Sequence, residues 1–268
     1  MSHIQVQDTG NGKQEFRIYP ANQPANNQYV YAGNPVISFE LPNSNVLLDP
    51  STLRLTGRIR YLTGSVTDTA AVRLDQYLGI NSCFENVAWS SKHSRAVIER
   101  INHYPKLLQS ILPATNSLSG FMSDMQCQNM TTQELAFQNK AFSARMNTTQ
   151  GISFCTPVYT GLTMASGNRL PLMQLGGLIL SIDIASNQAV FTRNNTDSPE
   201  YILEDLSLVG SYYTPDVEER EALANNLEGE LEMNVFSSLF SVVQSTVHSS
   251  TFSLGMKELV SCFFSFVP

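Results

Sequence analysis

The residues that most often carry chemistry, histidine and cysteine, are few and scattered in this chain. They are His3, His93, His103 and His248, and Cys83, Cys127, Cys155 and Cys262. No H-E-x-x-H motif and no C-x-x-C pair occurs among them, which argues against a zinc site. We expect the thiols to be free and buried, and the histidines to occupy surface positions or satisfied core positions.

The other motifs of catalytic or phosphate-binding sites are also missing from the sequence. There is no G-x-S-x-G nucleophile elbow, and the pair Gly12–Lys13 lacks the earlier glycine of a phosphate-binding loop. Asp183 stands in the apolar segment LILSIDIA and could be a buried acid, but the alternation of this segment favours the polar face of a strand. We therefore predict no catalytic residue, no cofactor-binding residue, no metal ligand, no cofactor and no enzyme activity.

The composition of the chain limits the kinds of partner that the protein is expected to bind. The chain has 268 residues, a formal charge of −7 and only 15% charged residues, so its polarity comes from Asn, Gln, Ser and Thr. An acidic chain of this kind is not expected to bind nucleic acid or an acidic membrane surface. The first residues lack the hydrophobic core of a secretion signal, and Leu170–Ala185 is too short and too polar to span a bilayer. We expect a soluble protein that is not secreted by a signal peptide.

Hydrophobic periodicity predicts a β-rich chain. The predicted strands cover residues 35–41, 52–62, two stretches within 80–100 around a turn at 90–92, 152–160, 178–185, 189–193 and 201–213. About eight short strands joined by irregular loops indicate a sandwich, barrel or jelly roll. Trp89 is the expected core anchor. Arg54, Arg58 and Arg60 alternate with apolar residues, and we interpret them as the solvated face of a strand.

The remaining stretches are interpreted as connections. Residues 1–33 are expected to form an arm and a lead-in, and residues 102–112 a short helix that Pro113 ends. Residues 114–150 are polar and aperiodic, which predicts a long surface excursion. A helix should follow Thr214 or Asp216 as its cap and stop at Gly229, and its Glu218, Glu219 and Glu221 are expected to face solvent.

Four phrases of the sequence resemble a known family. They are PVISFELPNSNVLLDPSTLRLTGRIRYL, GNRLPLMQLGGLILSIDIA, YILEDLSLVGSYYTP and SSTFSLGMKELVSCFFSFVP. The family is that of double jelly-roll major capsid proteins of eukaryotic DNA viruses, of the polinton-like virus and virophage type. The resemblance implies a first jelly roll at 34–214 after the arm at 1–33, a helical linker at 215–230, and the incomplete beginning of a second roll at 231–268.

The same resemblance implies a structural role without catalytic residues. Subunits of this family form homotrimeric, pseudohexagonal capsomers that tile an icosahedral shell beside neighbouring capsomers and minor capsid proteins. The chain would then be a virion component assembled inside the host cell, with no sequence-specific contact to nucleic acid and no membrane span. We expect residues 114–150 and 211–230 to contribute to subunit contacts, because they are long and polar and lie at the edge of the strand set.

Two other functions remain open at this stage. A single jelly roll could be a minor capsid or vertex protein, and a jelly roll could also bind a carbohydrate or a receptor. The binding module would need a concave face rich in aromatic residues and carboxylates, which the sequence does not single out. A cupin-type enzyme would need clustered histidines, and the four in this chain are scattered.

Overall fold

The computed structural model of the protein describes residues 13–22, 27–63, 73–74, 78–115, 151–164, 169–192, 200–226 and 235–236. The predictions for the excursion beyond residue 115, for Gly229 and for the beginning of a second roll after residue 236 lie outside these residues. The same holds for His3, His248, Cys127 and Cys262. The division of the chain into domains stays a prediction.

Twelve strands and five helices are described. The strands are β1 (Lys13–Pro20), β2 (Gln28–Tyr29), β3 (Val36–Leu41), β4 (Leu47–Thr63), β5 (Arg73–Leu74), β6 (Phe84–Ser91), β7 (Val97–Ile101), β8 (Ile152–Pro157), β9 (Leu170–Pro171), β10 (Leu178–Ile184), β11 (Phe191–Thr192) and β12 (Glu200–Thr214). The helices are the 3-10 helix η1 (Gly79–Cys83), α1 (Tyr104–Thr115), α5 (Gly161–Met164), α6 (Asn187–Val190) and α7 (Val217–Asn226).

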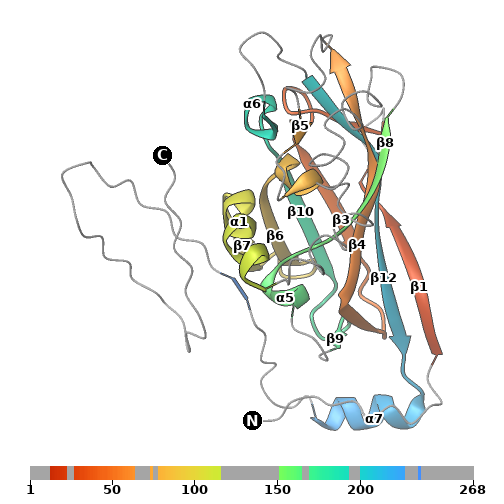
Figure 1. Cartoon of the computed structure of the whole chain (residues 1–268). Helices are drawn as coiled ribbons and strands as arrows, with labels where there is room; N and C mark the ends of the chain where they lie inside the picture. The colour runs from red at the N-terminus through yellow and green to blue at the C-terminus, as the bar shows by residue number, and fades with distance from the viewer. Residues whose placement is uncertain are drawn as a thin grey trace.

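Eight of the strands form two antiparallel sheets that are layered as a sandwich (Figure 1). The first sheet has the order β1-β12-β4-β8, with the short strands β2 and β9 beside it, and the second has the order β3-β10-β6-β7. When the eight are numbered along the chain, these orders become 1-8-3-6 and 2-7-4-5. This is the strand order of a jelly roll, in which the chain crosses repeatedly between two sheets. The predicted all-β jelly-roll class is confirmed.

The core lies between the two sheets. Strand β10 alternates buried apolar residues with half-buried polar ones from Leu180 onward, as predicted for this segment. Leu180 stands opposite Trp89 of β6, and both side chains are fully buried. The indole N–H of Trp89 donates to the hydroxyl of Thr160 at 3.2 Å, so the polar atom of this anchor is satisfied. Trp89 is the core anchor that the sequence predicts.

The two longest strands, β4 and β12, pair in the middle of the first sheet, and a bulge interrupts β12. Its register with β4 shifts between Glu204 and Ser207, and Asp205 has a positive φ of 55°. The extra residue moves the inward-facing positions from odd to even numbers, so that Leu203 and Leu206 both point into the core. Gly57 of β4 lies under the bulge, because a Cβ there would contact the side chain of Leu206.

The arm predicted for the N-terminal residues is wrong for the stretch 13–20. This stretch forms β1, which pairs with β12 along its whole length, from Lys13 opposite Thr214 to Pro20 opposite Ser207. Its side chains alternate in exposure as in a strand, but the apolar Phe16 and Ile18 lie on the exposed face. The usual pattern of apolar residues inward and polar residues outward is therefore inverted, which hides the strand in the sequence.

Four further boundaries differ from the predictions. Strand β4 begins at Leu47 rather than at residue 52, and α1 continues past Pro113 to Thr115. The strand predicted at 189–193 is reduced to β11, which follows the single helical turn α6. The turn between β6 and β7 spans residues 92–96, a little later than predicted.

Candidate assembly surface and buried polar clusters

The structure does not bring the candidate histidines together. His93 lies in the turn between β6 and β7, whereas His103 follows the far end of β7, and both are exposed. His103 Nδ1 lies 2.7 Å from Oε1 of Glu85. Within the described parts of the chain, no three His, Cys, Asp or Glu side chains are grouped so that they could hold a metal ion.

The two described cysteines are free thiols. Cys83 is buried and Cys155 is half-buried. Burial raises the pKa of both thiols above the ordinary value. A thiol that is harder to deprotonate is a poor nucleophile, so neither residue has the electrostatic setting of a reactive cysteine.

Asp183 occupies the polar face of β10, as predicted. Its Oδ2 accepts a hydrogen bond from the side-chain amide of Asn86 at 2.9 Å, and the carboxyl group is half-buried. The carbonyl oxygen of the same Asn86 side chain accepts from the backbone N–H of His103 at 3.3 Å. Asn86 thus links β6, β10 and the end of β7, which is a structural arrangement rather than an acid–base pair.

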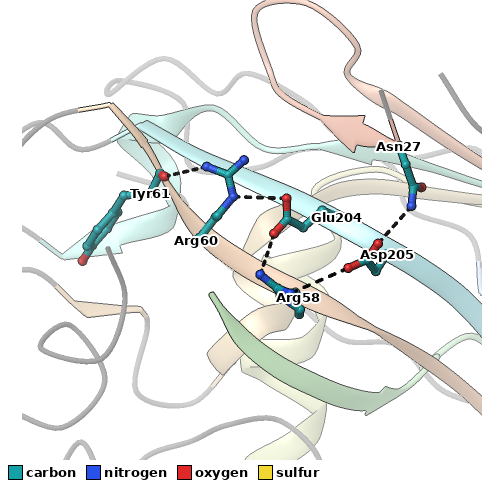
Figure 2. Close-up of polar contacts among 6 residues, drawn as sticks. All are labelled: Asn27, Arg58, Arg60, Tyr61, Glu204 and Asp205. Carbon is teal, nitrogen blue, oxygen red and sulfur yellow. Dashed lines mark hydrogen bonds and ion pairs between the residues drawn. The ribbon is translucent and has the colours of Figure 1, made fainter. Parts of the chain in front are cut away.

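The arginines of β4 form an ion-pair cluster with β12 (Figure 2). Oε1 of Glu204 lies 3.0 Å from Arg58, and its Oε2 lies 3.1 Å from Nε of Arg60. The side chains of Glu204 and Arg60 are only 12% and 15% exposed, whereas that of Arg58 is 39% exposed. At the bulge, Asp205 lies 4.0 Å from Arg58 and accepts a hydrogen bond from Asn27 at 3.0 Å.

This cluster corrects the prediction of a solvated arginine face. Glu204 stands directly opposite Arg58 in the register of the two strands, and Arg60 lies two residues further along the same face of β4. The acidic partner therefore sits between both cations. Arg54 is also not freely solvated, because its guanidinium donates to the backbone oxygens of Ser51 and Leu53.

A second cluster fixes the start of α7 against the end of β12. Oδ1 of Asp216 accepts from the backbone N–H of Glu219 at 2.9 Å, and the Glu219 carboxylate accepts from the backbone N–H of Asp216 at 3.0 Å. This reciprocal pair is a capping box, with Asp216 as the cap. The hydroxyl of Tyr213 donates to the same carboxylate, 2.6 Å from Oε1. Glu219 is buried, so its predicted position on a solvated helix face is wrong.

A third cluster surrounds Glu99, which the sequence did not single out. Glu99 stands opposite Trp89 in β7 and is 2% exposed. Its Oε1 accepts from the backbone N–H groups of Gly161 at 2.7 Å and Phe236 at 2.8 Å, and its Oε2 accepts from Leu162 at 3.1 Å. Burial raises the pKa of this carboxyl group, and the amide donors oppose the shift.

The largest exposed apolar side chains of the described residues lie on β1. Phe16 is 72% exposed and Ile18 is 67% exposed, and they share one face of the strand at positions i and i+2. Val209, opposite Ile18 on β12, is half-buried and extends this face inward along the sheet. Strand β1 ends the order of its sheet, so an apolar face and a strand edge coincide. Such edges favour contact with another chain unless they are covered.

The strand order of the two sheets defines the chain as a jelly-roll module. No family model and no curated protein matches the chain. None of the described helices is long and apolar enough to cross a bilayer.

Solved virus structures are similar to the chain. One is the crystal structure of PBCV-1 VP54 fitted into a cryo-EM reconstruction of the virophage Sputnik, with 13% identity, a TM-score of 0.43, and coverage of 80% of this chain and 45% of that chain. The quasi-atomic model of the PBCV-1 capsid matches with the same values. The Sputnik virophage itself matches with 10% identity, a TM-score of 0.48, and coverage of 76% and 48%. The chain spans less than half of the length of these structures.

Proposed function

We propose that this protein is a structural component of a virus capsid, namely a major capsid protein. The observation that carries the proposal is the strand order of the two sheets, which is that of a jelly roll. Jelly rolls recur in capsids because their sheet flanks and loops serve lateral contact and display without any chemistry. Because a fold alone does not define a function, the buried carboxylates and the exposed apolar face of the roll must also fit this role.

The surfaces support packing between subunits rather than catalysis. The buried carboxylates of Glu204 and Glu219 are both engaged in ion pairs or caps within the chain. Phe16 and Ile18 offer an apolar face at a sheet edge, which a neighbouring subunit would cover. This combination suits a shell subunit.

In the full proposal the described jelly roll is the first of two. Residues 215–230 form the linker, and residues 231–268 belong to the second roll. Three copies form a pseudohexagonal capsomer that joins other capsomers and minor capsid proteins in an icosahedral virion. Assembly takes place inside the host cell, and the protein makes no sequence-specific contact with nucleic acid. Residues 114–150 and 211–230 contribute to subunit contacts.

The proposal can be tested on the exposed face of β1. We expect Phe16→Ser combined with Ile18→Ser to shift the protein from trimer toward monomer in sedimentation-velocity runs. The folded monomer should keep its stability, because surface substitutions change the free energy of unfolding by no more than about 0.5 kcal/mol. Val97→Ser is the matched control, since Val97 is 61% exposed at the edge of the other sheet. An unchanged trimer in the double variant would show that β1 is not part of the subunit interface. A monomeric wild-type protein would contradict the proposal.

A further inference from the structure

Glu99 joins two parts of the chain that are far apart in sequence. Two of its three amide donors, Gly161 and Leu162, belong to the roll and begin α5. The third donor is Phe236, which is 137 residues away and follows α7. In Figure 1 the short blue piece at residues 235–236 lies beside α5. The carboxylate therefore holds the roll and the chain beyond the linker at the same point.

The lack of space around Gly161 also indicates a close contact with residues 235–236. A Cβ at Gly161 would have as its nearest neighbours the backbone N of Phe236 at 2.6 Å and the backbone of Val235 at 2.7 Å. These distances are too short for any real side chain. The backbone of residues 235–236 thus passes directly over Gly161, and the lack of a side chain there is what allows the approach.

The segment is held chiefly through its main chain and one ring. The Phe236 ring is partly buried and packs against the hydrophobic core of the roll. The Val235 side chain, in contrast, is 40% exposed. A segment that is held by a backbone amide and a single apolar side chain resembles a peptide bound in a pocket.

The surroundings of Glu99 show that the site is built for amide donors rather than for a cation. No ion pair to Lys, Arg or His is found for Glu99 within the described residues, and its neighbours are Thr160, Tyr104 and the three backbone N–H groups. A buried carboxylate keeps its stability only when its oxygens accept hydrogen bonds. Loss of the Phe236 amide would remove one of these donors.

We propose that Glu99 and Gly161 form a docking site for the main chain of residues 235–236, which fixes where the chain that leaves α7 returns to the roll. The site is independent of the proposed capsid role, because all of its parts lie within one chain. The docking requires that residue 161 has no side chain and that the ring of Phe236 packs on the roll, whereas the exposed side chain of Val235 takes little part.

Hydrogen exchange at single amides, measured on the whole chain by mass spectrometry with electron-transfer fragmentation, tests this proposal. In the wild-type protein we expect the Phe236 amide to be protected. Both Glu99→Ala, which removes the acceptor, and Gly161→Ala, which fills the space of the segment, should accelerate exchange at Phe236 by about 10- to 100-fold, the range expected for a hydrogen bond to a charged group. The amides of β10 should stay protected and serve as the internal reference.

Glu221→Ala is the matched control, because it removes an exposed carboxylate of α7. It should leave exchange at Phe236 unchanged. If exchange in β10 also becomes faster in Glu99→Ala, this variant has lost its fold. The Gly161→Ala variant then tests the proposal, because it keeps the carboxylate oxygens of Glu99 as acceptors. Unchanged exchange at Phe236 in Gly161→Ala, or an unprotected Phe236 amide in the wild-type protein, would overturn the proposal.

Discussion

The carboxylate of Glu204 accepts a hydrogen bond from Nε of Arg60 at 3.1 Å, across the boundary between β12 and β4. The two residues are 144 positions apart in sequence, and both side chains are mostly shielded from water. Their contact ties together the two longest strands of the first sheet at the point where the bulge interrupts the register.

Removal of the charge of Glu204 should destabilise the protein. Glu204→Gln removes the negative charge next to the shielded guanidinium of Arg60, so we expect the free energy of unfolding to fall by about 1–3 kcal/mol. Urea unfolding followed by fluorescence is suitable, since Trp89 is the single tryptophan of the chain. Asp205→Asn is the control and should change the stability by no more than about 0.5 kcal/mol, because Asp205 is 60% exposed. An unchanged free energy of unfolding in Glu204→Gln would show that the ion pairs of Glu204 contribute nothing to stability.

The bulge of β12 depends on Gly57. In Gly57→Ala the new methyl group would meet the buried side chain of Leu206 and the backbone oxygen of Glu204, the latter at 3.1 Å. We expect a loss of about 1–3 kcal/mol, as is usual for overpacking. Gly33→Ala provides the comparison, since Gly33 is exposed and its nearest neighbour is one flexible side-chain atom of Val30. Equal stability of both variants would mean that the sheet accommodates the methyl group at the bulge.

The contact between Tyr213 and Glu219 should stabilise the junction of β12 and α7. Tyr213→Phe removes a donor from a buried carboxylate, and we expect the free energy of unfolding to fall by about 1–3 kcal/mol. Hydrogen exchange in α7 should become faster at the same time. Tyr31→Phe removes a hydroxyl from a side chain that is half exposed and should have no measurable effect. Slow exchange in α7 of Tyr213→Phe would show that the capping box of Asp216 suffices.

Glu99 should make stability depend on pH. Its pKa in the folded protein is raised by burial above the ordinary value of 4.5. The folded state therefore binds this proton more tightly than the unfolded state, and the resulting stability is present below pH 4.5 and is lost as the pH rises through the folded pKa. The free energy of unfolding of the wild-type protein relative to Glu99→Gln should thus decrease over this window. A difference that stays constant or increases with pH would contradict the direction of the shift.

The strands that face the core are predictable from the sequence. Strand β12 shows the extent and the limit of this, because its buried positions change from odd to even numbers. Tyr201 and Leu203 repeat at odd positions, and Leu206 and Leu208 repeat at even ones. The sequence thus shows that the pattern slips by one residue. Only the register with β4 shows that Asp205 is the extra residue and that a bulge causes the slip.

The polar clusters are less predictable, because their partners are remote in sequence. The spacing of Arg58 and Arg60 indicates one face of a strand, but nothing in the neighbouring residues indicates that Glu204 will lie between them. The same is true of Glu99 and Phe236, which meet only through the folded chain. Strand β1 was missed for a different reason, since its apolar residues face outward and the sheet pairing depends on β12.

The most direct test of the capsid proposal is electron cryomicroscopy of the purified product of the complete gene and of any particles that it forms. We expect pseudohexagonal trimers or closed shells, in which the described jelly roll stands beside a second roll in each subunit and a neighbour covers the face of Phe16 and Ile18. A strict monomer that binds a sugar saturably would contradict it.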